Sequence, residues 1–217
     1  MAIVGATGSG KSTIINALCR FYEINKGDIL FDGQSIKDIN KFDLRKQIAL
    51  VQQDVFLFSG KVIDNIRLGN VQMSQEEIQS ISTAVNSHNF INNFPLKYEQ
   101  ELIEGGGSIS SGQRQLLSFA RALAVKPQIL VLDEATSSVD MDTERQIKNG
   151  IKEMTRGRTS IIIAHRLSTL MHVDKVLVLK NGKIIEFGKR NELLQQRGIF
   201  YKLCQAQIKS EQLSAEQ

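Results

Sequence analysis

The sequence predicts an α/β fold with a mostly parallel β-sheet, because short apolar runs alternate with segments of helical apolar spacing. The apolar runs at 2–4, 48–51, 129–132 and 161–164 have lengths that suit buried strands. Polar residues directly follow the last three of these runs. Because ligands of parallel sheets bind where the carboxyl ends of the strands meet, we expect the functional groups of this chain along that edge.

A glycine-rich segment follows the first predicted strand and reads Gly5-Ala6-Thr7-Gly8-Ser9-Gly10-Lys11-Ser12. Its spacing matches a P-loop, in which converging backbone N–H groups cradle phosphate. Lys11 can reach the β- and γ-phosphates of a nucleotide, and the Ser12 hydroxyl can bind Mg²⁺. Ile14, Leu18 and Phe21 recur at helical spacing, so a helix N-terminus would face the anion. We therefore predict a P-loop, which leaves kinase, GTPase and ATPase open, rather than a glycine-rich turn that merely joins two elements.

Further elements are predicted from capping pairs, turn residues and apolar spacing. They are a strand at 27–33 ending in an Asp-Gly turn, a helix after Ser74 with Ile78, Ile81 and Val85 on one face, a helix at 113–124, a helix with Ile147, Ile151 and Met154, a hairpin of 176–179 and 183–185 joined by Asn181-Gly182, and a helical tail from Asn191 with Phe200, Cys204 and Ile208 on one face.

The composition is that of an ordinary globular domain, with 217 residues of which 41% are hydrophobic. The formal net charge of +4 is spread along the chain, which favours a solvated surface over a nucleic-acid site. Cys19 and Cys204 form neither a disulfide framework nor a metal-binding spacing, so we interpret both as packing residues on helix faces in a reducing cytosol. With no apolar run long enough to span a bilayer and no signal peptide, we expect a soluble chain.

Candidate chemical groups follow three of the predicted strands. Asp133 comes directly after a buried strand, where a carboxylate can hold Mg²⁺ through its water shell opposite a P-loop. Glu134 points differently and can polarise or deprotonate an attacking water. His165 can reach a γ-phosphate, and Gln53 can offer its amide oxygen to Mg²⁺ or water. Taken alone, however, a histidine here is more often structural, and the glutamine is uninformative.

The segment Ile109-Ser110-Ser111-Gly112-Gln113 closely resembles the Leu-Ser-Gly-Gly-Gln signature of ATP-binding cassette (ABC) proteins. It lies where that family has it, between the P-loop and the carboxylate strand. The motifs occur in the family's order, and the resemblance covers essentially the whole chain. The resemblance implies a role for each of five residues. Gln53 would be the Q-loop glutamine, Asp133 the Mg²⁺ aspartate, Glu134 the catalytic glutamate, Asp140 the D-loop aspartate and His165 the switch histidine.

The resemblance implies a P-loop NTPase (RecA-like) core at about 1–68 and 125–217, with an inserted α-helical subdomain at about 69–124. It also implies an ATPase that uses ATP and Mg²⁺. The residues expected to contact the nucleotide are Gly5, Ala6, Thr7, Gly8, Ser9, Gly10, Lys11, Ser12, Thr13, Gln53, Ser110, Ser111, Gly112, Gln113, Asp133 and Asp140. Those expected to take part in catalysis are Glu134, His165, Lys11 and Gln53. Those expected at the metal are Ser12, Gln53 and Asp133.

The resemblance also implies partners. In the family, two such domains pack head to tail as a homo- or heterodimer, and the signature of one binds the γ-phosphate held by the other. Three parts of the sequence resemble the corresponding segments of ABC exporters: Ala135, the run Ala164 to Thr169 and the run Gln53 to Gly60. This implies a domain that hydrolyses ATP on the cytoplasmic side of a membrane and drives a transmembrane domain. Phe56 and Phe58 lie in the segment that docks such a domain, but core packing in a strand is an equally good interpretation.

Three departures from the family stand out. The sequence begins directly before the P-loop, whereas the family has upstream strands and an adenine-stacking aromatic residue. We therefore expect the N-terminal strands and the adenine-stacking loop to be absent. We also expect the antiparallel β-subdomain to be only a remnant and ATP binding to be weak. Ser111 replaces a signature glycine, and Gln52 replaces a usual proline. Two other functions stay open: a soluble ABC ATPase that acts on nucleic acid or ribosomes, and a truncated nucleotide-binding module with little hydrolysis.

Overall fold

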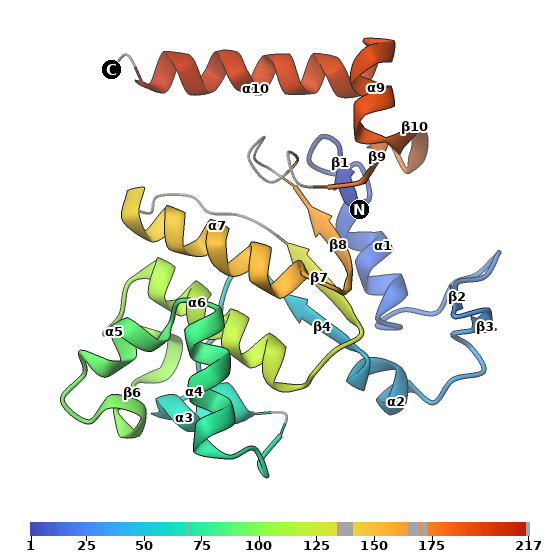
Figure 1. The fold of residues 1–217 in the computed structure, drawn as a ribbon. Coiled ribbons are helices and arrows are strands. Elements are labelled where there is room, and N and C mark those ends of the chain that lie inside the picture. The colour runs from blue at the N-terminus through green and yellow to red at the C-terminus, as the bar shows by residue number, and fades with distance from the viewer. Residues whose placement is uncertain (69, 134–140, 165–169, 171–172, 216–217) are drawn as a thin grey trace. The chain divides into compact units, whose positions relative to one another are not determined.

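The computed structural model describes residues 1–68, 70–133, 141–164, 170 and 173–215. The chain divides into two compact units. Unit 1 comprises Met1–Ile39 and Ile161–Gln217, and unit 2 comprises Asn40–Ser160. Each unit combines strands with helices (Figure 1), and the strands that flank the glycine-rich loop are parallel. The predicted α/β class with a mostly parallel sheet is confirmed.

Unit 1 is built around the central strand β1. Its elements are β1 (Ala2–Val4), α1 (Lys11–Leu18), β2 (Leu30–Phe31), β3 (Gln34–Ser35), β8 (Thr159–Ile163, which begins in unit 2), β9 (Lys175–Lys180), β10 (Lys183–Lys189), α9 (Arg190–Gln196) and α10 (Ile199–Ala215). β1 runs parallel to β8 and β9, with Ala2 opposite both Ile162 and Val176. All three residues of β1 are buried, as expected for a strand with neighbours on both sides. The glycine-rich loop therefore leaves the carboxyl edge of a parallel sheet.

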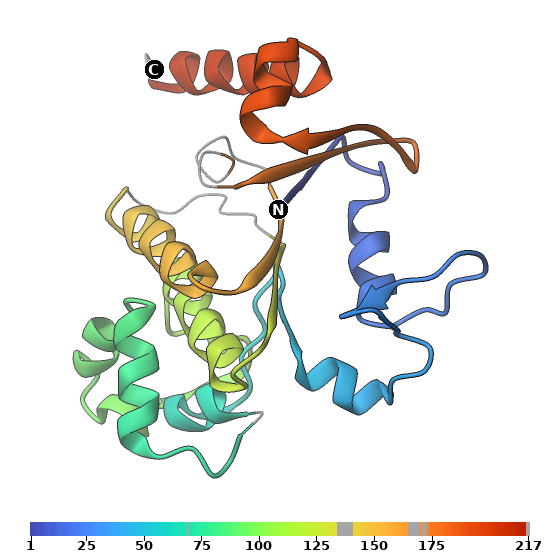
Figure 2. The same cartoon turned by 45° about the vertical axis from the view of Figure 1, so that its right-hand side comes forward.

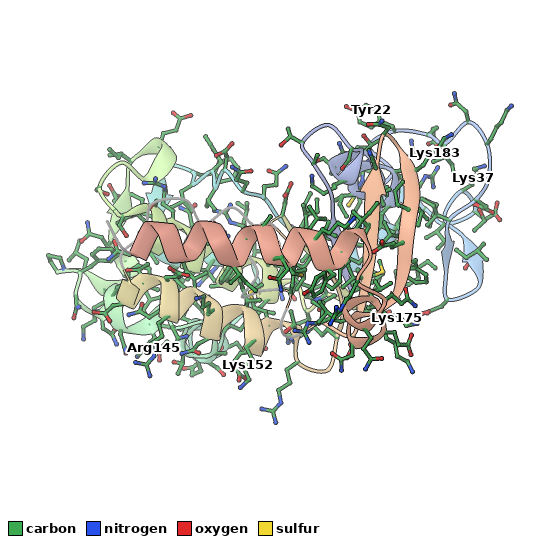
Figure 3. All side chains as sticks on the ribbon, turned by 90° about the horizontal axis from the view of Figure 1, so that it is seen from above. Tyr22, Lys37, Arg145, Lys152, Lys175 and Lys183 are labelled. Carbon is green, nitrogen blue, oxygen red and sulfur yellow. The ribbon has the colours of Figure 1, made fainter. Side chains whose placement is uncertain are left out.

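The predicted hairpin is confirmed as β9 and β10, which pair antiparallel on either side of Asn181 and Gly182. Both turn residues have positive φ, at 51° and 73°, which is the geometry that Asn-Gly favours in two-residue hairpin turns. Figure 2 shows the two strands as a twisted ribbon that leads into α9. Lys175 and Lys183 lie at opposite ends of this ribbon (Figure 3), so these two cations do not gather into one patch.

The carboxylate of Glu186 in β10 binds the start of α10, where its oxygens accept hydrogen bonds from the N–H groups of Ile199 and Phe200. Helix N-termini have unsatisfied N–H groups, and a carboxylate there also favours the helix dipole. We expect Glu186→Ala to lower the free energy of unfolding by about 1–3 kcal/mol, measured by chemical denaturation. The control is Glu192→Ala, since Glu192 pairs with Lys189 at the surface, where loss should cost under about 1 kcal/mol. Equal effects of the two substitutions would contradict the prediction.

Unit 2 contains two parallel strands and most of the helices. Its elements are α2 (Lys41–Lys46), β4 (Ile48–Val51), β5 (Gly60–Lys61), α3 (Val62–Arg67), α4 (Gln75–Ala84), α5 (His88–Asn92), the 3₁₀ turns η1 (Lys97–Glu99) and η2 (Glu104–Gly106), β6 (Glu101–Leu102), α6 (Ser111–Ala124), β7 (Ile129–Asp133) and α7 (Met141–Thr155). β4 pairs parallel with β7, with Val51 opposite Leu132. Helix α6 is the most buried helix of this unit and contacts α3, α4 and α7 (Figure 1). Gly150 lets α7 approach closely, because a Cβ there would lie 3.2 Å from the Phe119 ring.

The predicted helix starts in unit 2 follow their capping residues. Ser74 and Glu77 form the expected capping box at α4. Ser110 and Gln113 form another at α6, so this helix begins two residues before the predicted Gln113. Within the described part of the chain, no helix is long and apolar enough to cross a membrane.

Two predicted boundaries in unit 1 are wrong. Helix α1 ends at Leu18 and Arg20 takes a left-handed φ of 49°, so Phe21 leaves the helix and lies half-exposed. The strand predicted at 27–33 is limited to Leu30 and Phe31, although the Asp-Gly turn after it is confirmed. Asp28 accepts hydrogen bonds from the Ile29 N–H and the Ser35 hydroxyl, and such local bonds compete with strand pairing. Cys204 is buried on α10 as expected, whereas the buried Cys19 caps α1 rather than lying within it.

Candidate functional site

The glycine-rich loop between β1 and α1 has the backbone of a phosphate cradle. Gly5, Gly8 and Gly10 have φ values of 156°, 78° and 105°. Gly10, the N-cap of α1, takes the left-handed backbone conformation, which residues with a Cβ rarely adopt. A Cβ at Gly5 would clash with the carbonyl oxygen of Leu179 and would lie 2.7 Å from the Ser9 hydroxyl. The space above Gly8 is open, with nothing within 4 Å of its Cβ position.

Two buried polar side chains line this loop. The Nζ of Lys11 donates hydrogen bonds to the carbonyl oxygens of Gly5 at 2.9 Å and Ala6 at 3.1 Å. The hydroxyl of Ser9 is also buried and has no hydrogen-bond partner among the described residues. Buried polar groups are normally satisfied, so a hydroxyl without a partner beside a buried ammonium group fits a loop built to receive an anion.

Helix α1 adds its own positive end to the loop. It begins at Lys11, and its first bond within the helix runs from the Ile14 N–H to the Gly10 carbonyl. The N–H groups of the first turn, which include those of Ser12 and Thr13, have no acceptor within the helix, and the helix dipole favours negative charge there. The side chains of Ser12 and Thr13 are exposed, so both hydroxyls are accessible to a ligand or metal.

The turn of the β9–β10 hairpin supports the loop from behind. The Gly182 N–H donates a 2.9 Å hydrogen bond to the Ser9 carbonyl, and a Cβ on Gly10 would lie 3.7 Å from the Cα of Gly182. The sequence predicted the hairpin but not this contact, because no local pattern links residues so far apart. The turn thus takes part in holding Ser9 in place.

The carboxyl edge of the strand pair in unit 2 carries two other predicted residues. Asp133 is the last residue of β7, and Gln53 lies two residues after the end of β4. Because Val51 is opposite Leu132, the segments that follow β4 and β7 leave the sheet side by side. Asp133 is half-buried and Gln53 is exposed. Glu134, Asp140 and His165 lie outside the described residues.

The signature-like segment forms the N-terminus of α6. The Ser110 hydroxyl accepts a hydrogen bond from the Gln113 N–H, and the Gln113 side-chain oxygen accepts one from the Ser110 N–H, both at 3.1 Å. Within the helix, the N–H groups of Ser111 and Gly112 in the first turn have no acceptor. Ser111 is exposed and has a negative φ, so its side chain causes no backbone strain where the signature has glycine. This helix end is a second candidate anion site.

Phe56 and Phe58 lie at the surface of unit 2 in a segment without strand structure. Their side chains are 49% and 47% exposed, and their rings meet edge to face at 5.0 Å between centroids. Leu57 between them is fully buried. The interpretation that the two aromatic side chains pack in the core is therefore wrong.

Comparisons with known proteins identify relatives of this chain. Residues 1–137 match the family model of the ABC transporter. An uncharacterised ABC transporter ATP-binding protein of Bacillus subtilis, YfiC, is 45% identical over 96% of this chain and 34% of its own length. An ATP-dependent lipid A-core flippase of Syntrophus aciditrophicus is 42% identical over 100% of this chain and 36% of its own length. The solved structure of a bacterial Atm1-family ABC exporter with ATP bound is 38% identical, with a TM-score of 0.87 over 95% of this chain and 36% of that one.

Proposed function

This chain belongs to the ABC transporter family, and we propose that it is the part of an exporter that binds and hydrolyses ATP. It spans about a third of the length of the curated relatives that it matches, so the activity of a whole transporter is part of this proposal. The observation that carries the proposal is the loop from Gly5 to Ser12. There, a positive-φ backbone, a buried ammonium group and a helix N-terminus converge on one small volume.

The residues present fit the triphosphate of ATP. Backbone N–H groups of the loop and of the start of α1 bind the phosphate oxygens, and the Ser9 hydroxyl offers one more donor. Lys11 donates to two loop carbonyls, which holds its charge inside the cradle. The same ammonium group is then available to the β- and γ-phosphates.

The residues also fit Mg²⁺, which prefers hard oxygen ligands. We assign the Ser12 hydroxyl as a direct ligand, Asp133 as a ligand through water and Gln53 as a ligand through its amide oxygen. When bound, the ion neutralises charge that develops on the phosphates. Asp133 and Gln53 are suited to this role because both leave the same carboxyl edge in unit 2.

We assign proton transfer to Glu134 and contact with the γ-phosphate to His165, on the strength of their positions after predicted strands and of the family resemblance. A carboxylate held near the attacking water accepts its proton as the bond to phosphorus forms. Asp140 belongs to the same group of proposed nucleotide contacts. The rest of the rate acceleration would come from positioning of the reactants and from the positive groups of the P-loop.

The proposed partners are a second copy or a close relative of this chain and a transmembrane domain, on the cytoplasmic side of a membrane. The anion-binding start of α6 supports the first, because it offers first-turn N–H groups of Ser111 and Gly112 to a phosphate. The half-exposed aromatic pair Phe56 and Phe58 supports the second, because exposed aromatic side chains are common contact residues. The substrate would be chosen by the transmembrane domain.

Phosphate release from ATP tests the proposal. We expect the chain to release phosphate with Mg²⁺ present, to stop when the metal is chelated, and to double its mass by sedimentation when ATP is bound. Reading hydrolysis and mass together separates a hydrolysing domain from a module that only binds. A chain that neither binds ATP nor releases phosphate would contradict the proposal, as would hydrolysis that depends on added nucleic acid.

A further inference from the structure

Helix α6 holds the segment that carries the exposed aromatic pair through the side chain of Arg121. The Nε of Arg121 donates to the Asn65 carbonyl, its Nη1 donates to the Phe56 carbonyl and its Nη2 donates to the Asn65 side-chain oxygen, each at 2.9 Å. The guanidinium carbon also lies 5.7 Å from the centre of the Phe58 ring, within range of a cation–π contact. One side chain of α6 therefore contacts both members of the aromatic pair.

Asn65 in α3 completes the attachment. Its side-chain oxygen accepts a 3.0 Å hydrogen bond from the Phe58 N–H, and its amide nitrogen donates to the Phe58 carbonyl at 2.9 Å and to the Lys61 carbonyl at 3.2 Å. Its side chain is only 3% exposed. Because both backbone groups of Phe58 are bound by one buried amide, Phe58 cannot shift without breaking hydrogen bonds.

A second connection runs through the loop before α6. The Leu57 carbonyl accepts a 2.9 Å hydrogen bond from the Gly105 N–H. Arg114, in the first turns of α6, donates to the carbonyl oxygens of Gly106 and Ile109. The segment is therefore connected to α6 near the start of the helix through Leu57 and near its end through Phe56 and Phe58.

The chemistry of Arg121 makes the link stiff. Its planar guanidinium group donates in three fixed directions, which a lysine cannot reproduce. Burial lowers the pKa of Arg121 from its ordinary value, but the group remains charged under all conditions in which proteins fold. Charged donors make hydrogen bonds roughly twice as strong as neutral ones. Arg121 lies ten residues after Ser111 in α6, or about 15 Å along a helix.

We propose that Arg121 and Asn65 are positioning residues that make Phe56 and Phe58 move together with the start of α6. This rests on the proposed function, in which the start of α6 binds the γ-phosphate of a partner's ATP. A helix of this length transmits a displacement of its first turn to Arg121, and the hydrogen bonds of Arg121 and Asn65 pass it to the aromatic pair. Nucleotide binding at the start of α6 thereby displaces Phe56 and Phe58 at the surface near its other end.

Amide hydrogen exchange tests this proposal, because the Phe58 N–H is the donor of one of the hydrogen bonds that hold the segment. The full chain is compared with and without a non-hydrolysable ATP analogue and Mg²⁺. In the native chain we expect the analogue to slow exchange both at 111–115 and at 55–61. In Arg121→Lys we expect slowing at 111–115 to persist, while the change at 55–61 falls by about tenfold or more.

Two further variants sharpen the test. Lys126→Gln is the matched control, because Lys126 follows α6 and pairs with Glu77 at the surface; it should behave as the native chain does. Asn65→Ala removes both side-chain bonds to Phe58 while keeping the carbonyl that Arg121 contacts, and it carries the same test should Arg121→Lys fail to fold. The double variant should lose no more of the nucleotide response at 55–61 than the more severely affected single variant, since both substitutions act through the same contacts.

The outcomes separate the proposal from the function on which it rests. An unchanged response at 55–61 in Arg121→Lys, or in Asn65→Ala where only that variant folds, overturns the link. A native chain without slowing at 111–115 or in the P-loop contradicts the proposed function, and the link is rejected with it. A merely structural role for Arg121 would raise exchange at 55–61 equally with and without nucleotide, which also overturns the proposal.

Discussion

Glu134→Gln is expected to slow ATP hydrolysis by about 10²–10⁴-fold while leaving ATP affinity unchanged. The amide has nearly the same shape as the carboxylate but cannot accept the proton of the attacking water. The P-loop and the proposed Mg²⁺ ligands are untouched by this change, so binding should persist. Among the proposed catalytic residues, Glu134 is the one for which the sequence predicts loss of rate without loss of ligand.

Single-turnover phosphate release is the measurement for this variant, with nucleotide affinity determined in parallel. The matched control is Glu144→Gln in α7, because Glu144 pairs with Lys148 and has no proposed role in the reaction. The control should hydrolyse ATP at the native rate. An unchanged single-turnover rate in Glu134→Gln would remove this residue from the catalytic group.

Gly5→Ala is expected to weaken ATP binding by about 100-fold or more, which corresponds to at least about 2.7 kcal/mol. The added Cβ would clash with the carbonyl oxygen of the buried residue Leu179, which is a backbone atom of β9. It would also press on the Ser9 hydroxyl at 2.7 Å. The loop must therefore move, and both the N–H groups that bind phosphate and the carbonyl that holds Lys11 move with it.

Titration of the chain with ATP measures this effect, and denaturation is measured alongside to show that the variant is folded. Gly27→Ala is the control, because Gly27 also has a positive φ, at 82°, but nothing lies within 4 Å of its Cβ position. It should share the backbone strain and keep native affinity for ATP. Binding by Gly5→Ala within about threefold of the native chain would show that the loop tolerates the clash.

Local patterns predicted most of the elements correctly. The apolar runs of β1, β4, β7 and β8, the Asn-Gly hairpin and the capping boxes at Ser74 and Ser110 all appear in the structure. Each depends on residues within a few positions of one another, so sequence spacing is enough to find it. The predicted boundaries at Phe21 and at 27–33 were wrong because local backbone conformations and side-chain hydrogen bonds compete with regular structure. Examples are the left-handed φ of Arg20 and the hydrogen bonds of Asp28.

The sequence by itself predicted the P-loop, the signature-like helix start and the positions of the main strands along the chain, because these rest on short-range chemistry. Only the tertiary structure decided that Phe56 and Phe58 are exposed and that Gly182 supports Ser9. It alone paired Arg121 with Asn65, which is 56 positions away in the chain. Such contacts depend on where whole elements pack, and nothing in the spacing of residues along a chain records which distant carbonyl a buried arginine will reach.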